Sequence, residues 1–137
     1  MAKRIRKVDY YVLHAKDQPG EGAHLFKTLK KHKVNLLAVT AFPAAGGSQV
    51  DLIPENAAEL TKLAKKFGWT LSQKKTGFLA QGKDRAGALA KLAEKLGKAG
   101  INITALDAIA AGKDRYGAIF WVKPKDVEKA AKLIGAK

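Results

Sequence analysis

Two sets of polar residues recur 67 positions apart, and each set could hold a small zwitterion. Each set begins with an Asp and a Gly between a strand-like and a helix-like run, and each ends with an Asn that opens the next apolar run. A helix N-terminus offers unpaired N–H groups to a carboxylate. An Asp can bind an ammonium group, and an Asn amide can hold either group. The residues are Asp17, Gly20 and Asn35 in the first set, and Asp84, Gly87 and Asn102 in the second.

These residues equally admit a purely structural interpretation. Asp17 and Asp84 would cap the helices that follow them, by accepting from free N–H groups, and the two glycines would allow tight packing. Asparagine is depleted from strands. Asn35 and Asn102 would therefore either satisfy a turn backbone or present an amide at the end of a sheet.

The two sets belong to a longer internal repeat. When each position is compared with the position 67 further on, the matches run from Lys16/Lys83 to Gly68/Gly135 without a gap. Most of the substitutions exchange one apolar residue for another. A period of this length is too long for a solenoid unit, so the repeat predicts a duplicated small domain.

Each copy reads as a strand, a helix, two strands and a second helix. Short runs rich in β-branched and aromatic residues predict the strands, and apolar residues at helical spacing predict the helices. Asn56 with Glu59 resembles a capping box, and Pro124 suits the first turn of the last helix. The expected elements are strands at 8–15, 35–42, 48–54 and 69–73 with helices at 20–33 and 56–67, then strands at 77–81, 101–109 and 118–122 with helices at 86–99 and from 124.

This order predicts the α+β class: two ferredoxin-like βαββαβ units in tandem, with antiparallel sheets and helices packed on one face. The expected boundaries are a basic tail at 1–7, a first unit at 8–75 and a second unit at 76–137. The second copy has no fourth strand of its own, so either that strand is missing or another segment or chain fills the edge. An uncovered edge invites pairing, which predicts a homodimer.

The stretch KDRAGALAKLAEKLGKAGINI in the second copy resembles the ACT domain. The shared features are an Asp-x-Pro/Ala-Gly turn after a strand, a helix with spaced leucines, and Gly-Ile-Asn-Ile opening the second strand. Ala86 stands where the family usually has Pro, and the first copy departs further, with KVNL in place of GINI. The two copies together cover residues 8–137.

The resemblance implies a regulatory module that binds a small ligand, most often an amino acid, at the interface between paired units. It implies a free-standing sensor or a regulatory subunit of a separate metabolic enzyme. By motif position, the implied ligand-binding residues are Asp17, Gln18, Pro19, Gly20 and Asn35, together with Asp84, Arg85, Ala86, Gly87 and Asn102.

Composition and the absence of certain motifs exclude several classes of protein function. The absence of cysteine excludes disulfides and thiolate zinc sites and fits a cytoplasmic location. No apolar run is long enough for a transmembrane helix, and we expect no secretory signal in the N-terminal residues. The three histidines and the serines form no metal or nucleophile motif. We therefore expect a protein that is not an enzyme and that has no cofactor, no metal and no membrane partner.

An RNA-binding protein is the alternative hypothesis. RNA-recognition domains use the same element order and stack bases on strand aromatics, and the net charge of +14 attracts nucleic acid. Phe78 and the run RYGAIFWV partly match that pattern, but Ile119 and Trp121 break its register and the first copy has no aromatic there. Aromatics exposed on the open sheet face would favour RNA, whereas a packed face would favour the amino-acid sensor.

Overall fold

The computed structural model describes residues 4–137, which form two compact units. The first unit is Asp9–Lys75, and the second is Thr76–Lys137 together with residues 4–8. Strand β1 (Arg4–Ala15) therefore contributes its first residues to the second unit and the remainder to the first. Of the expected basic tail, residues 4–7 are part of this strand, and residues 1–3 lie outside the described residues.

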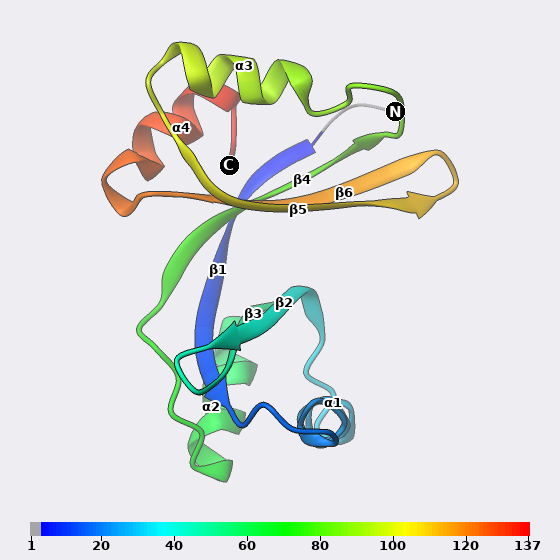
Figure 1. Cartoon of the computed structure of the whole chain (residues 1–137), viewed down its shortest axis with the longest axis vertical. Helices are drawn as coiled ribbons and strands as arrows, with labels where there is room; N and C mark the ends of the chain where they lie inside the picture. The colour runs from blue at the N-terminus through cyan, green and yellow to red at the C-terminus, as the bar shows by residue number, and fades with distance from the viewer. Residues whose placement is uncertain (1–3) are drawn as a thin grey trace. The chain divides into compact units, whose positions relative to one another are not determined.

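The first unit is built on three antiparallel strands in the order β2-β3-β1 (Figure 1). Strands β1 and β2 (Leu36–Ala44) both pair with β3 (Gly47–Pro54). Helix α1 (Glu21–Lys31) connects β1 to β2, and helix α2 (Ala57–Phe67) follows β3. The fourth strand expected at 69–73 is reduced to a single bridge, between Leu13 and Leu71.

The second unit repeats this order with different segments. Strand β4 (Lys75–Lys83) leads through helix α3 (Ala90–Lys98) to β5 (Ile103–Gly112) and β6 (Arg115–Val122). Strand β6 pairs antiparallel with both β4 and β5. A short 3₁₀ turn (Pro124–Asp126) then opens helix α4 (Val127–Ile134).

The first residues of β1 fill the edge of the second unit that the repeat left without a strand. Strand β1 neighbours β4 in the sheet order β1-β4-β6-β5. Ile5 packs against the core of this unit, and the ammonium group of Lys7 lies 3.4 Å from the carboxylate of Glu128 in α4. A segment of the same chain, far away in sequence, therefore completes the βαββαβ pattern.

Each unit has one core, between one face of its strands and its two helices. In the first unit Leu52 of β3 and Leu60 of α2 are fully buried, and Leu29 of α1 is nearly so. In the second unit the rings of Phe78 and Phe120 stack with centroids 5.2 Å apart, and they pack with residues of α3 and α4, two helices that lie on the same side of the strands (Figure 1). The predicted α+β class, with helices on one face of antiparallel sheets, is confirmed.

Helix α3 begins at Ala90 rather than at the expected residue 86. Gly87 has a φ of 72°, which is left-handed and outside the helical region. Residues 86–89 instead form a turn, in which the backbone N–H of Ala90 donates to the carbonyl of Gly87 at 2.9 Å. The apolar stripe alone could not locate this start, because it continues through the turn.

The expectation that the two copies align without a gap is wrong for β3 and β6, although the helices that follow return to the offset of 67, with Gly68 after α2 and Gly135 after α4. Ala15 pairs with Ser48 in the first unit, whereas Gly82 pairs with Tyr116 in the second. The counterpart of Ser48 is therefore Tyr116, one residue beyond the offset of 67. The extra residue is Ala111, at an irregularity of register in β5. Because strand side chains alternate between faces, a one-residue shift decides which residues reach the core.

Candidate functional site

The predicted loops lie between the first strand and the first helix of each unit. Gly20 precedes α1 with a φ of 94°, in the left-handed region that favours glycine. Within the described residues, no side chain caps the N-terminus of α1 or α3. The capping role considered for Asp17 and Asp84 is therefore not observed, and both carboxylates are exposed.

The other loop residues differ between the units. The amide Nε2 of Gln18 donates to the carboxylate of Glu21 at 3.0 Å, so this side chain is held by its own loop. Arg85, at the same place in the second unit, lines two cavities described below. Pro19 and Ala86 are exposed and line neither of these cavities.

The two predicted asparagines lie at the opposite end of their sheets from these loops. Strand β1 ends where Ala15 pairs with Ser48, whereas β2 begins just after Asn35, where Leu36 pairs with Pro54. Six residues of β3 separate these two positions, which corresponds to about 20 Å at ~3.3 Å per residue. The second unit has the same arrangement, because Asn102 precedes the pair of Ile103 with Val122. One unit alone therefore does not bring its loop and its asparagine together.

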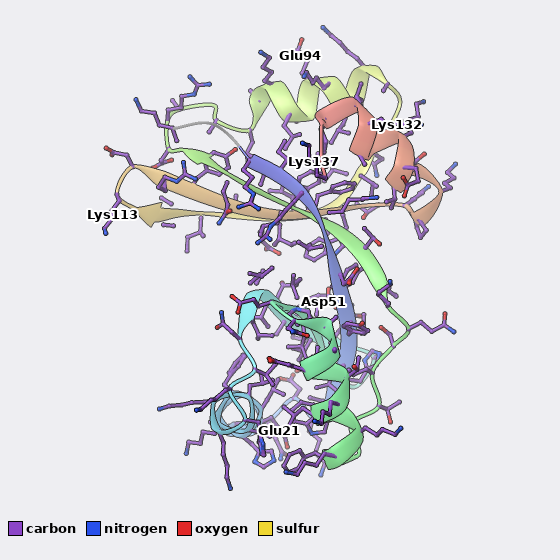
Figure 2. All side chains as sticks on the ribbon, turned by 180° about the vertical axis from the view of Figure 1, so that it is seen from behind. Glu21, Asp51, Glu94, Lys113, Lys132 and Lys137 are labelled. Atoms are coloured by element: carbon purple, nitrogen blue, oxygen red, sulfur yellow. The ribbon has the colours of Figure 1, made fainter. Side chains whose placement is uncertain are left out.

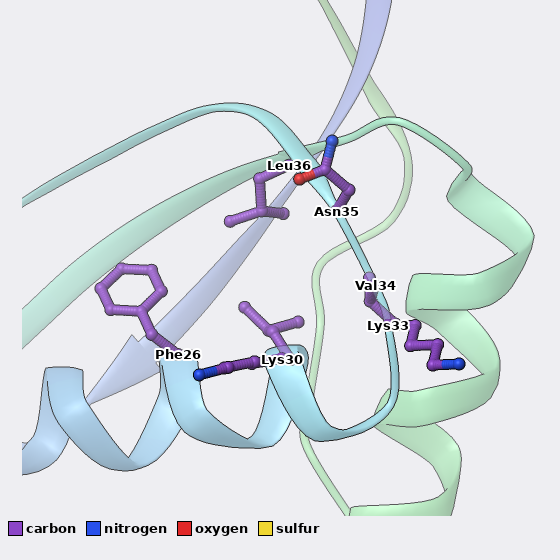
Figure 3. A pocket seen from close by; sticks show the side chains of 7 residues that line it. Phe26, Lys30, Lys33, Val34, Asn35 and Leu36 are labelled. Atoms are coloured by element: carbon purple, nitrogen blue, oxygen red, sulfur yellow. The ribbon is translucent and has the colours of Figure 1, made fainter.

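Asn35 lies at an open cavity of about 380 Å³ near the end of α1 (Figure 3). Its Nδ2 atom donates to the Glu55 carboxylate at 3.3 Å, and the backbone N–H of Glu55 donates to the carbonyl of Asn35 at 2.9 Å. These two bonds give Asn35 a structural role, since they join the start of β2 to the end of β3. The remaining lining residues are Phe26, Leu29, Lys30, Lys33, Val34 and Leu36.

The loop of the second unit lies at a cavity of about 350 Å³ that reaches the edge strand β5. Asp84, Arg85 and Gly87 line it from the loop, and Ala108, Ile109 and Ala110 line it from β5. Figure 2 shows Lys113 at the tip of the hairpin that β5 forms with β6. The cavity thus joins three of the predicted ligand-binding residues to a strand with an open edge.

The residues of β5 were not predicted as part of a site. Their signal in the sequence is only an apolar run, which is typical of any strand. In the structure β5 is exposed along nearly its whole length, and the side chain of Ile109 is 71% exposed. A strand this apolar and this exposed indicates a surface that another molecule covers.

The strand aromatics of the second unit are unavailable for stacking on RNA bases. Phe78 and Phe120 are fully buried in the core of the second unit, and Tyr116 belongs to the same core. Trp121 is only 6% exposed. A base-stacking platform needs exposed rings, so the structure removes the main motif-based support for the RNA hypothesis.

Residues 4–137 contain neither a metal-ligating cluster nor a membrane-spanning helix. No group of His, Cys, Asp or Glu side chains in this part of the chain could hold a metal ion. None of its helices is both long and apolar enough to cross a membrane.

No protein-family model matches the sequence, and no curated protein is similar to it in sequence. Solved structures do share its fold. A protein from Bacteroides thetaiotaomicron is 15% identical, with 96% of this chain and 88% of that one covered and a TM-score of 0.82. The ligand-free regulatory subunit of aspartate kinase from Thermus thermophilus is 17% identical. The comparison covers 98% of this chain and 93% of that one, with a TM-score of 0.64. The regulatory subunit of aspartate kinase from Thermus flavus is 16% identical. The comparison covers 98% of this chain and 94% of that one, with a TM-score of 0.56.

At these identities the likeness establishes the fold. The chain has the fold of the aspartate kinase regulatory subunits, which agrees with the resemblance to the ACT domain seen in its sequence.

Proposed function

We propose that this chain is a regulatory protein whose second unit binds an amino acid between the loop 84–87 and the edge strand β5. The observation that carries the proposal is the cavity of about 350 Å³ that these two segments line together. Small-ligand sites are concave, largely apolar and fitted with a few polar groups. This open cavity combines apolar residues of β5 with polar groups of the loop, at the place where the sequence repeats its polar residues.

The lining offers a partner to each part of an amino acid. The exposed carboxylate of Asp84 binds the ammonium group, and the guanidinium of Arg85 binds the carboxylate in the two-point geometry that arginine favours. Ala108, Ile109 and Ala110 offer an apolar surface to the ligand side chain. The wall formed by Ile109 is exposed, so a single copy leaves the ligand partly open to water.

Pairing of two copies through β5 would close this cavity. Two identical edge strands that pair antiparallel place the end of one beside the start of the other. The loop 84–87 lies at the end of β5, and Asn102 immediately precedes its start. In such a dimer the Asn102 amide of one copy reaches the cavity of the other, which supplies the third predicted polar group. Burial of Leu106 and Ile109, both exposed in one copy, would stabilise the pair.

The regulated partner would be a separate metabolic enzyme. The Thermus proteins that share this fold are regulatory subunits of aspartate kinase. A subunit of that kind changes the activity of another chain when its ligand binds. We propose the same mode of action here, with the enzyme identified by capture on the immobilised, ligand-loaded protein.

A thermal-shift screen of the twenty amino acids at two salt concentrations tests the ligand. A ligand at one hundred times its Kd stabilises the protein by about 2.7 kcal/mol, which raises the melting temperature measurably. The expected result is one amino acid whose shift survives high salt and disappears in Asp84→Asn, while Asp17→Asn, the matched change in the first unit, keeps it. No shift with any amino acid would refute the proposal.

Analytical ultracentrifugation tests the pairing. Ile109→Lys places a charge on the exposed surface of β5 and should convert a dimer to a monomer, with weaker amino-acid binding. Phe42→Lys, a charge on the other exposed edge strand, is the control and should leave the dimer intact. A monomeric wild-type protein that still binds its amino acid would show that pairing is unnecessary.

A further inference from the structure

A second cavity of about 320 Å³ lies beside the same loop, between the end of β4 and the start of α3. Three cationic side chains line it, and no carboxylate does. The lining residues that matter are Lys83, Arg85, Lys91 and Tyr116, with Gly82 and Gly87. The proposed amino-acid site does not account for Lys83 and Lys91, since neither lines that cavity.

Tyr116 gives this cavity a hydrogen-bond donor without a partner. Tyr116 is only 6% exposed, and its hydroxyl has no hydrogen-bond partner among the described residues. A buried polar group without a partner is unusual, because it has lost its bonds to water. Tyr116 lines this cavity and also the proposed amino-acid cavity, and an anion held beside Lys83 and Lys91 would supply the missing acceptor.

The backbone is shaped to hold the tyrosine ring in place. Gly82 is the direct pairing partner of Tyr116 across β4 and β6. A Cβ atom at Gly82 would lie 2.8 Å from Cε1 of the ring, which is too close for any real contact. Only glycine leaves room for the ring against β4 at this position. The place of the Tyr116 hydroxyl therefore depends on Gly82.

The electrostatics of the cavity favour an anion. Burial raises the pKa of Tyr116 above its ordinary value, while the positive charges of Arg115 and Arg85 act in the opposite direction. The phenol is therefore protonated at neutral pH and donates. The positive charges that line the cavity are those of Lys83, Arg85 and Lys91.

We propose that this cavity is a second ligand site and that it binds a phosphoryl group carried by a small molecule. A phosphoryl dianion offers several acceptor oxygens and enough charge for the two lysines and the phenol together, with Arg85 shared between the two cavities. A carboxylate has one charge and two oxygens, so it would leave part of this donor set unused. The volume exceeds that of inorganic phosphate, which leaves room for the molecule that carries the group.

Calorimetric titration of the full chain with inorganic phosphate, pyrophosphate and ATP tests the site. Tyr116→Phe removes only the hydroxyl and keeps the ring, so the fold should be retained. It should weaken pyrophosphate or ATP binding by about tenfold or more, as expected for one hydrogen bond to a charged group. Lys91→Gln should weaken binding to a similar extent.

Lys95→Gln is the matched control, because Lys95 lies one turn further along α3 and outside this lining. If Lys95→Gln weakens binding as much as Lys91→Gln does, the anion responds only to the overall charge and the site is refuted. Unchanged affinity in Tyr116→Phe would refute it as well, as would an absence of binding to all three probes.

Arg85 and Tyr116 line both cavities, so the two proposed sites are separated by the lysines that line only one of them. Lys83→Gln and Lys91→Gln touch only the phosphoryl cavity and should leave the amino-acid shift intact. A single-stranded oligonucleotide serves as a third probe. If it binds more tightly than ATP and responds equally to Lys91→Gln and Lys95→Gln, the basic surface binds nucleic acid and the small-molecule site is overturned.

Discussion

The first unit has a cavity at the place where the second unit has the proposed phosphoryl site, and the two differ in charge. The cavity in the first unit has a volume of about 260 Å³ and is lined by one lysine, one glutamate and two histidines. The second unit has three cations and a buried phenol there. The lining of the first cavity is Leu13, His14, Ala15, Lys16, Glu21, His24, Leu25 and Trp69.

The polar groups of the first unit are also satisfied internally. Glu21 accepts a hydrogen bond from Gln18, which occupies the place of Arg85. Ser48 occupies the place of Tyr116, and it pairs with Ala15 where the second unit needs a glycine. Two units with one fold therefore differ mainly in the loop and in one strand pair. The cores were kept while the chemistry at the sheet end diverged, because packing constrains the core far more than the loop.

The largest expected effect is on the free energy of unfolding, after a large core residue of each unit is truncated. Phe120 and Leu52 are register equivalents, and both are fully buried. Phe120→Ala should cost about 3–5 kcal/mol, and Leu52→Ala about 2–5 kcal/mol, through lost burial and the cavity left behind. Denaturant titration gives the cost, and hydrogen exchange should show each loss of protection concentrated in the mutated unit. A cost below about 1 kcal/mol would contradict the packing described here.

The next effect tests the strand pair that differs between the units. Gly82→Ala should cost about 1–3 kcal/mol, because the new methyl group would clash with the ring of Tyr116. In a Tyr116→Ser background the same change should be nearly neutral, since it reproduces the Ala15–Ser48 pair of the first unit. A double-mutant cycle measures the coupling. Additive costs would show that the ring does not depend on the glycine.

A smaller effect concerns the charge of the two cavities. Ala88 lines the second cavity at the place that Glu21 holds in the first. Ala88→Glu brings a carboxylate among the cations and should weaken pyrophosphate binding by about tenfold, or 1.4 kcal/mol. Ala93→Glu on α3, which lies outside this lining, is the control. Titration calorimetry measures the pyrophosphate affinity of both variants. Equal losses of affinity would contradict a localised site.

The smallest effect compares the second helix of each unit. The side chain of Asn56 accepts from the backbone N–H of Glu59 at 3.1 Å and caps α2. Asn56→Ala should therefore cost about 1 kcal/mol. Asp126 at the start of α4 makes no such bond, so Asp126→Ala should change stability by less than about 0.5 kcal/mol. Thermal denaturation measures both, and equal costs would mean that the cap is not what stabilises α2.

Local sequence patterns were sufficient for most of the elements. Apolar stripes located the helices, and short runs of β-formers located the strands, because burial of one face imposes those periods. The cap at Asn56 was predicted and is confirmed. The start of α3 was not, since the left-handed backbone at Gly87 interrupts the helix without altering its apolar stripe.

The site was predicted only in part. The loop residues Asp84, Arg85 and Gly87 do line a cavity together. Asn102 lies at the other end of the sheet from them. The predicted strand–helix–strand order already implies this separation, because two strands joined through a helix run parallel. Whether Asn102 reaches a ligand in a second copy stays a prediction.

By itself, the sequence determined the class of fold, the repeated order of elements and the loops where a ligand could bind. Only the tertiary structure decided that residues 4–8 complete the second unit, and that Tyr116 rather than Trp121 or Ile119 faces the helices and a cavity. The physical reason is the same in both cases. Helix and strand periods are local, but pairing between distant strands and the register of that pairing depend on contacts that a linear pattern does not contain.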